Sequence, residues 1–182
     1  MEKKNPVKDY LFNYIKKSEK RFQRLFSQAK FDIIINNIIE NCYNKVSLMN
    51  NKEESLAVLG TGIIHYMLTN AMITSQRKIE YQGIEIDIII PNFKTLDKDP
   101  KKTLIICIPN TTDEKWIKEK LNQIYKIQSE KQNVWLVLTK DLKFKGKTYL
   151  IQKGNSSFSQ IIYDIANFVN VQGQNNLKIL RV

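Results

Sequence analysis

The chain has 182 residues and a formal net charge of +11 at pH 7, with 42% hydrophobic and 26% charged residues. These values are typical of one soluble globular unit, and the basic excess favours an acidic partner such as nucleic acid. Because the longest apolar run, 31–39, is broken by Asn36 and Asn37 and the first ten residues are highly charged, we expect a cytoplasmic protein without a membrane span or a secretion signal.

Apolar residues recur at helical spacing through the first seventy residues. Residues 7–28 predict an amphipathic helix, 31–49 a second helix with a wide apolar stripe, and 54–72 a largely buried third helix. Gly60 and Gly62 weaken the third helix, unless they serve to let this helix pack closely against the sheet.

After the third helix, the apolar period changes to that of β-structure. Six segments rich in isoleucine, valine and aromatic residues predict strands: 77–82, 83–91, 103–109, 133–140, 148–153 and 176–182. The polar segment 93–102 predicts a loop. Two further helices are predicted, at 111–130 with Thr112 or Asp113 as the cap and at 156–170 with Ser156 or Ser157 as the cap.

The order of these elements predicts an α/β fold. Three consecutive strands followed by a helix and a further strand can form a mixed sheet flanked by helices. We expect residues 1–50 to form an N-terminal helical extension that packs on a core made by residues 51–182, so that the whole chain is one globular unit.

The second predicted strand carries a short acidic motif. GIEIDIII at 83–90 places Gly83 four residues before Asp87, and helix, three strands, helix and strand follow one another over residues 54–139. This arrangement resembles the PD-(D/E)xK nuclease-like superfamily, in which the second strand carries a metal-binding aspartate in a pattern often written GxxxDIV. The resemblance implies a restriction-endonuclease-like fold, with the N-terminal helices added to it.

The third strand departs from the pattern of that superfamily. Members carry Glu-x-Lys there, in which the glutamate binds the metal and the lysine positions or activates water, whereas this chain has Ile106 and Ile108 in those places. The resemblance therefore implies a degenerate member, with no resident metal or cofactor expected. Mg²⁺ would be required only if the site had been rearranged.

Glu85 and Asp87 have three interpretations. In a working metal site, Glu53, Glu54 or Glu80 could complete the ligand set and Lys78 could replace the missing lysine, since Mg²⁺ needs two or more carboxylates. In a vestigial metal site, the two acids remain without catalysis. Alternatively, both acids face solvent on an alternating strand, opposite an inward row that consists of Ile84, Ile86, Ile88 and Ile90.

Two segments concentrate positive charge. Residues 1–30 hold nine basic and three acidic residues, and the basic side chains that crowd the predicted first helix are Lys16, Lys17, Lys20, Arg21 and Arg24. In the second segment, Lys143, Lys145 and Lys147 surround Phe144 and Tyr149, a mixture of cations and rings that can hold phosphates and stack on bases. The alternative for both segments is a solvated surface, with lysines protecting a sheet edge from association.

The remaining chemistry-bearing residues are few. The single histidine, His65, excludes a site with two or three histidine ligands, and Cys42 and Cys107 stand in apolar surroundings at no metal-ligand spacing, which indicates two buried free thiols. The sequence therefore predicts a non-catalytic nucleic-acid-binding or scaffold protein. The alternatives are a metal-dependent nuclease that uses Asp87, and an interaction module whose N-terminal helices bind a second copy or another protein.

Overall fold

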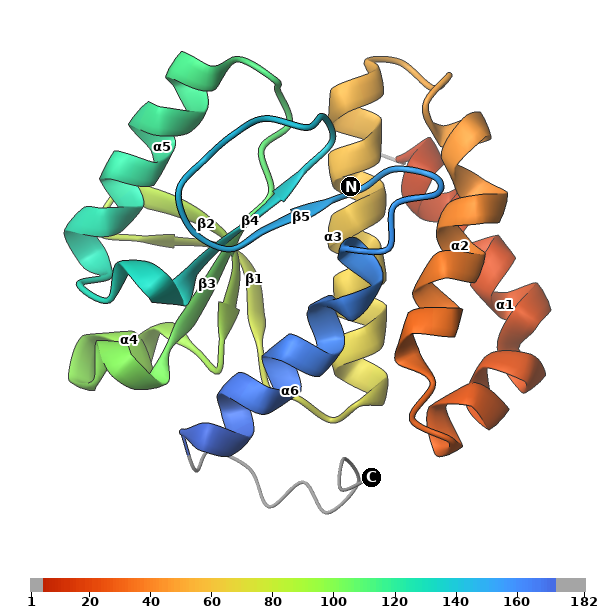
Figure 1. Cartoon of the computed structure of the whole chain (residues 1–182), viewed down its shortest axis with the longest axis horizontal. Helices are drawn as coiled ribbons and strands as arrows, with labels where there is room; N and C mark the ends of the chain where they lie inside the picture. The colour runs from red at the N-terminus through yellow and green to blue at the C-terminus, as the bar shows by residue number, and fades with distance from the viewer. Residues whose placement is uncertain (1–4, 173–182) are drawn as a thin grey trace.

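A five-stranded mixed sheet lies between two layers of helices in the computed structural model, which describes residues 5–172 (Figure 1). The strands stand side by side in chain order: β1 (Gln76–Tyr81), β2 (Ile84–Ile90), β3 (Leu104–Cys107), β4 (Val134–Leu138) and β5 (Thr148–Leu150). β1, β2 and β3 form an antiparallel meander, whereas β4 and β5 continue the sheet in parallel. The predicted order of helix, three strands, helix and strand is therefore confirmed.

Four helices cover one face of the sheet and two cover the other. The first group consists of α1 (Pro6–Ser27), α2 (Phe31–Val46), α3 (Lys52–Asn70) and α6 (Ile161–Val171), and the second of α4 (Phe93–Lys98) and α5 (Glu114–Ile127). No helix within residues 5–172 is both long and apolar enough to cross a membrane. The strand predicted at 176–182 lies outside the described residues.

Segment 93–102 was predicted as a loop, and this prediction is wrong. It forms α4 and a 3₁₀ turn at Pro100–Lys102. The side chain of Asn92 accepts a hydrogen bond from the backbone N–H of Thr95 at 3.0 Å, and Leu96 is buried in the apolar cluster beneath α5. A helix cap and one buried anchor are enough to order a segment whose overall polarity is typical of a loop.

The predicted caps of the later helices have different outcomes. Asp113 caps α5, because its Oδ1 accepts from the backbone N–H of Lys115 at 2.9 Å. Ser157 does not cap α6, which begins after a 3₁₀ turn at Phe158–Gln160 without a side-chain cap. Instead, its hydroxyl accepts from the backbone N–H of Leu150 at 2.9 Å, so it ties β5 to the segment that leads into α6.

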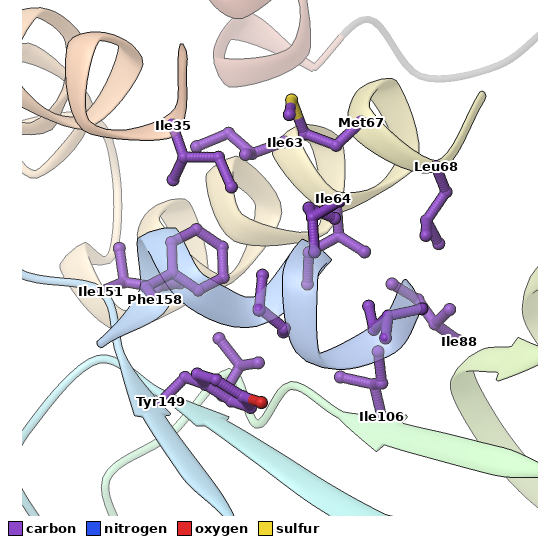
Figure 2. Packing of buried hydrophobic residues seen from close by; sticks show 14 of the residues in the cluster. Ile35, Ile63, Ile64, Met67, Leu68, Ile88, Ile106, Tyr149, Ile151 and Phe158 are labelled. Carbon is purple, nitrogen blue, oxygen red and sulfur yellow. The ribbon is translucent and has the colours of Figure 1, made fainter. Parts of the chain in front are cut away.

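The larger apolar cluster fills the space between the sheet and the four-helix layer. Figure 2 shows Ile88 and Ile106 of the sheet beneath α3 and α6, and Tyr149 and Phe158 towards the other end of the same cluster, near Ile151. A Cβ added at Gly60 would collide with the Cδ1 atom of Ile151, so this glycine lets α3 lie close to the end of β5. The predicted close packing at Gly60 is therefore confirmed.

We propose that the N-terminal helices fold together with the core. Val7, Leu11 and Phe22 of α1 are buried in the same apolar cluster as the sheet residues. At the other end of the described chain, the Tyr163 hydroxyl accepts from the backbone N–H of Phe31 at 3.0 Å and lies 2.7 Å from the carbonyl oxygen of Ala29. These hydrogen bonds join α6 to the turn between α1 and α2.

Both cysteines are buried free thiols, as predicted. Burial raises the pKa of the Cys42 thiol to about 11. The pKa of Cys107 is also raised, by burial and then by the nearby Asp87 carboxylate. Because the thiolate is the nucleophile, the raised pKa values make both thiols poor nucleophiles at neutral pH.

Candidate functional site

A cleft of about 420 Å³ lies between α3, the β1–β2 hairpin and the start of α5. The position that matches the nuclease-like motif, Asp87, lines it. Seven further charged or aromatic side chains share the cleft: Lys8, Glu54, Arg77, Lys78, Glu85, Trp116 and Lys120. The cleft is therefore where the sheet, the third helix and the fifth helix bring acids, cations and an aromatic ring together.

Both carboxylate oxygens of Asp87 are engaged by the protein itself. Oδ1 lies 2.6 Å from the Nζ of Lys78, and Oδ2 accepts a hydrogen bond from the backbone N–H of Ile108 at 2.8 Å. The Asp87 side chain is only 11% exposed, whereas that of Lys78 is 55% exposed. Asp87 thus links β1, β2 and the residue that follows β3, and we refer to these contacts as the Asp87 clamp.

The prediction that Asp87 faces solvent on a regular alternating strand is wrong. Residues two apart normally share one face of a strand, yet Ile86 packs in the smaller apolar cluster and Ile88 in the larger one on the opposite face. Lys78, which stands across from Asp87 between the pairs Arg77–Ile88 and Ile79–Ile86, has a φ of 49°. This left-handed conformation is rare for a residue with a side chain, and it marks a local distortion of the ladder at the clamp.

Only some of the acids considered as partners of Asp87 reach the cleft. Glu54 lines it from the first turn of α3, and Glu85 lines it from β2 with one oxygen 3.9 Å from the Nζ of Lys78. Glu53 and Glu80 are not among its lining residues. Lys120, which was not singled out in the sequence, donates from Nζ to the backbone carbonyl of Glu85 at 2.5 Å.

The arrangement around Asp87 does not fit a Mg²⁺ site. Mg²⁺ is held by carboxylate oxygens that are free to coordinate it, but a cation and a backbone N–H already occupy both oxygens of Asp87. Ile106 and Ile108 are buried where an acid and a lysine would be needed. Across residues 5–172, no group of three or more histidine, cysteine or acidic side chains lies close enough to share a metal ion.

The two basic segments singled out in the sequence lie on separate parts of the molecule (Figure 1). On α1, all five predicted binding residues are exposed: Lys16, Lys17, Lys20, Arg21 and Arg24. Lys143, Lys145 and Lys147 are exposed in the connection between β4 and β5. Lys147 is engaged within the protein, because its Nζ lies 3.0 Å from Asp164 and 4.4 Å from the centre of the Trp135 ring.

A second hollow, of about 590 Å³, runs between α1 and α3 and adjoins the cleft. The cleft and this α1–α3 groove share Lys8, Gly62 and Arg77 as lining residues. A Cβ added at Gly62 would lie 2.6 Å from the Cδ2 atom of Leu11, so the glycine allows α1 to approach α3 where the two hollows meet. The sequence predicted that Gly62 would allow close packing against the sheet, but this glycine lies against α1 instead. No spacing in the sequence indicated the groove.

The surroundings of His65 in the groove predict how the stability of the protein changes with pH. Partial burial, and then the neighbouring Arg77, lower the pKa of His65 below its ordinary value of about 6.5. As the pH falls, His65 therefore takes up a proton at a higher pH in the unfolded chain than in the folded one. Keeping His65 neutral costs the folded state nothing above about pH 6.5, but the free energy of unfolding decreases as the pH falls from there towards the folded-state pKa. When the free energy of unfolding is measured with urea at neutral and at mildly acidic pH, it should decrease less between the two pH values for His65→Gln than for the wild type. Parallel losses in the two proteins would contradict this assignment.

No protein-family model and no curated protein matches this chain. Its structure is similar to that of the restriction endonuclease PspGI in a complex with substrate DNA, with a TM-score of 0.52 and 14% sequence identity. The similarity covers 92% of this chain and 94% of the endonuclease chain, and therefore includes the N-terminal helices as well as the sheet. The chain thus has a restriction-endonuclease-like fold.

Proposed function

We propose that this protein binds nucleic acid through the cleft and the basic surface of α1, without cutting it. The observation that carries the proposal is the Asp87 clamp. At the position where the resemblance implies a metal-binding aspartate, Lys78 and the Ile108 N–H take up both carboxylate oxygens. Lys78 thus supplies the positive charge that a metal would otherwise provide, and the neighbouring cations remain available to phosphates.

The charges around the two hollows support phosphate binding. Lys8, Arg77 and Lys120 line the cleft, and Lys8 and Lys16 line the groove. Within residues 5–172, no acidic side chain lies within ion-pair distance of Lys8, Lys16 or Arg77. Contacts between such cations and phosphates release counterions, so binding should weaken steeply as salt is added.

The test is nucleic-acid binding by the wild type and by two charge-matched triple variants across a salt series. Neutralising Lys16, Lys20 and Arg24 to glutamine should weaken binding near 0.1 M salt by about tenfold for each phosphate that is no longer held, and should lower the salt dependence by about one unit per phosphate. The control neutralises the same number of basic residues on the opposite layer, at Lys94, Lys98 and Lys126, which are exposed on α4 and α5. Equal losses in both variants would show that only net charge matters. No binding at low salt would favour a protein partner or a second copy of the chain at the N-terminal helices.

A metal-dependent nuclease is the second candidate, because Glu54, Glu85, Asp87, Lys78 and Lys120 line one cleft. In this case the Asp87 clamp would open when Mg²⁺ and a substrate bind together. DNA incubated with Mg²⁺ or Mn²⁺ should then be cut by the wild type and left intact by Asp87→Asn. DNA that stays intact with the wild type, in samples where binding is demonstrated, supports the non-catalytic proposal.

A further inference from the structure

We propose that the ligand is single-stranded nucleic acid, held with its phosphates along the cations of the cleft and the groove and with bases stacked on Trp116 and Phe12. This inference rests on the proposed function and names the ligand class for the same surface. Because Lys8, Gly62 and Arg77 line both hollows, one strand can pass from the cleft into the groove.

Each hollow carries a large aromatic ring that the fold leaves exposed. Trp116 lines the cleft and is 41% exposed, and Phe12 lines the groove and is 64% exposed. The other tryptophan, Trp135, is buried against Tyr149 and Phe168. Trp116 and Phe12 are therefore not needed to fill the core, and their open faces are available to a ligand.

Cations stand beside both rings. Lys8, Phe12 and Lys16 follow one another at intervals of four residues on α1, which places them along one ridge of the helix surface. On α5, Lys120 follows Trp116 by the same interval, so the two side chains share a face of that helix. Cations alternating with exposed rings are the arrangement by which proteins hold the backbone of a single strand and stack its bases.

The rings favour a single strand over a duplex. In a duplex, the faces of the bases are already stacked on one another, so a protein ring can reach them only after the bases are unstacked, which is unfavourable. A protein partner would also cover Phe12 and Trp116, but it would have to neutralise Lys8, Lys16 and Arg77 with acids of its own. Phosphates supply that negative charge at every nucleotide.

The experiment compares fluorescently labelled oligo(dT), oligo(rU) and a duplex of the same length, with affinity measured by anisotropy. The wild type should bind the single strands more tightly than the duplex. Trp116→Ala and Phe12→Ala should each weaken single-strand binding by about fivefold to a hundredfold, the range for one stacked base, and should change duplex binding little. Comparing oligo(dT) with oligo(rU) shows whether DNA or RNA is preferred. The matched control is Leu48→Ala, which removes a side chain that is 86% exposed outside the two hollows.

Tryptophan fluorescence gives a readout that does not depend on affinity. Oligo(dT) should quench the wild type but not Trp116→Ala, whose remaining emission comes from the buried Trp135. Salt-sensitive binding without quenching, and without loss in either aromatic variant, would overturn this inference and leave the proposed function intact. Absence of binding to every probe at low salt would overturn both.

Discussion

Replacing Phe22 with alanine is expected to lower the free energy of unfolding by about 3–5 kcal/mol. The ring is completely buried, and its centre lies 6.3 Å from that of Tyr14 and 6.4 Å from that of Tyr66 on α3. Removing it takes apolar surface out of the core and leaves a cavity between α1 and α3 that the rigid helices can fill only in part. Urea unfolding followed by circular dichroism measures the loss.

Phe12→Ala is the matched control for this prediction. It makes the same chemical change ten residues earlier on the same helix, where the ring is 64% exposed, and should shift stability by no more than about 0.5 kcal/mol. If α1 and the sheet form one globular unit, Phe22→Ala lowers the midpoint of a single transition. A separate early transition that the mutation shifts, with the main transition unchanged, would show that the N-terminal helices unfold independently.

Much of the fold could be predicted because long apolar patterns report directly on burial. The spacing of Leu11, Phe22 and Phe26 predicted α1, and the isoleucines at 105 and 106 predicted a strand, which is β3 and is buried on both faces. The helix at 93–98 was missed because it has few apolar positions. Its order depends on the cap at Asn92 and the anchor at Leu96, both of which are local features of modest signal.

Of the residues that line the candidate site, the sequence pointed mainly to those on and beside β2. The spacing of Gly83 and Asp87 singled out Asp87, which lines the cleft, but Trp116 and Lys120 lie about thirty residues further along the chain and reach the cleft only through the crossover of α5. Alternation along β2 also gave the wrong environment for Asp87, because the strand changes face there. A periodic pattern assumes regular geometry, and it fails where a distortion positions a polar group.

The contacts of the Asp87 clamp predict that Asp87→Ala lowers the free energy of unfolding by about 2–4 kcal/mol. Most of this loss should come from the buried N–H of Ile108, because a donor left without an acceptor costs about 1–3 kcal/mol. The ion pair with Lys78 should contribute less than about 1 kcal/mol, since that lysine is 55% exposed. Chemical denaturation of the purified variants measures both contributions.

Asp87→Asn separates the two parts of the clamp, because the amide oxygen can still accept from the Ile108 N–H while the charge that pairs with Lys78 is lost. Asp87→Asn should therefore lower the free energy of unfolding by only about 1 kcal/mol. An equal loss in the two variants would mean that the charge, rather than the hydrogen bond, stabilises the fold.

The same unfolding measurements also test for a metal at Asp87, since a metal bound only by the folded state raises stability. If Asp87 serves the protein and not a metal, millimolar Mg²⁺ should leave the wild type and Asp87→Asn unchanged. Stabilisation of the wild type alone would instead place the metal at Asp87 and favour the nuclease.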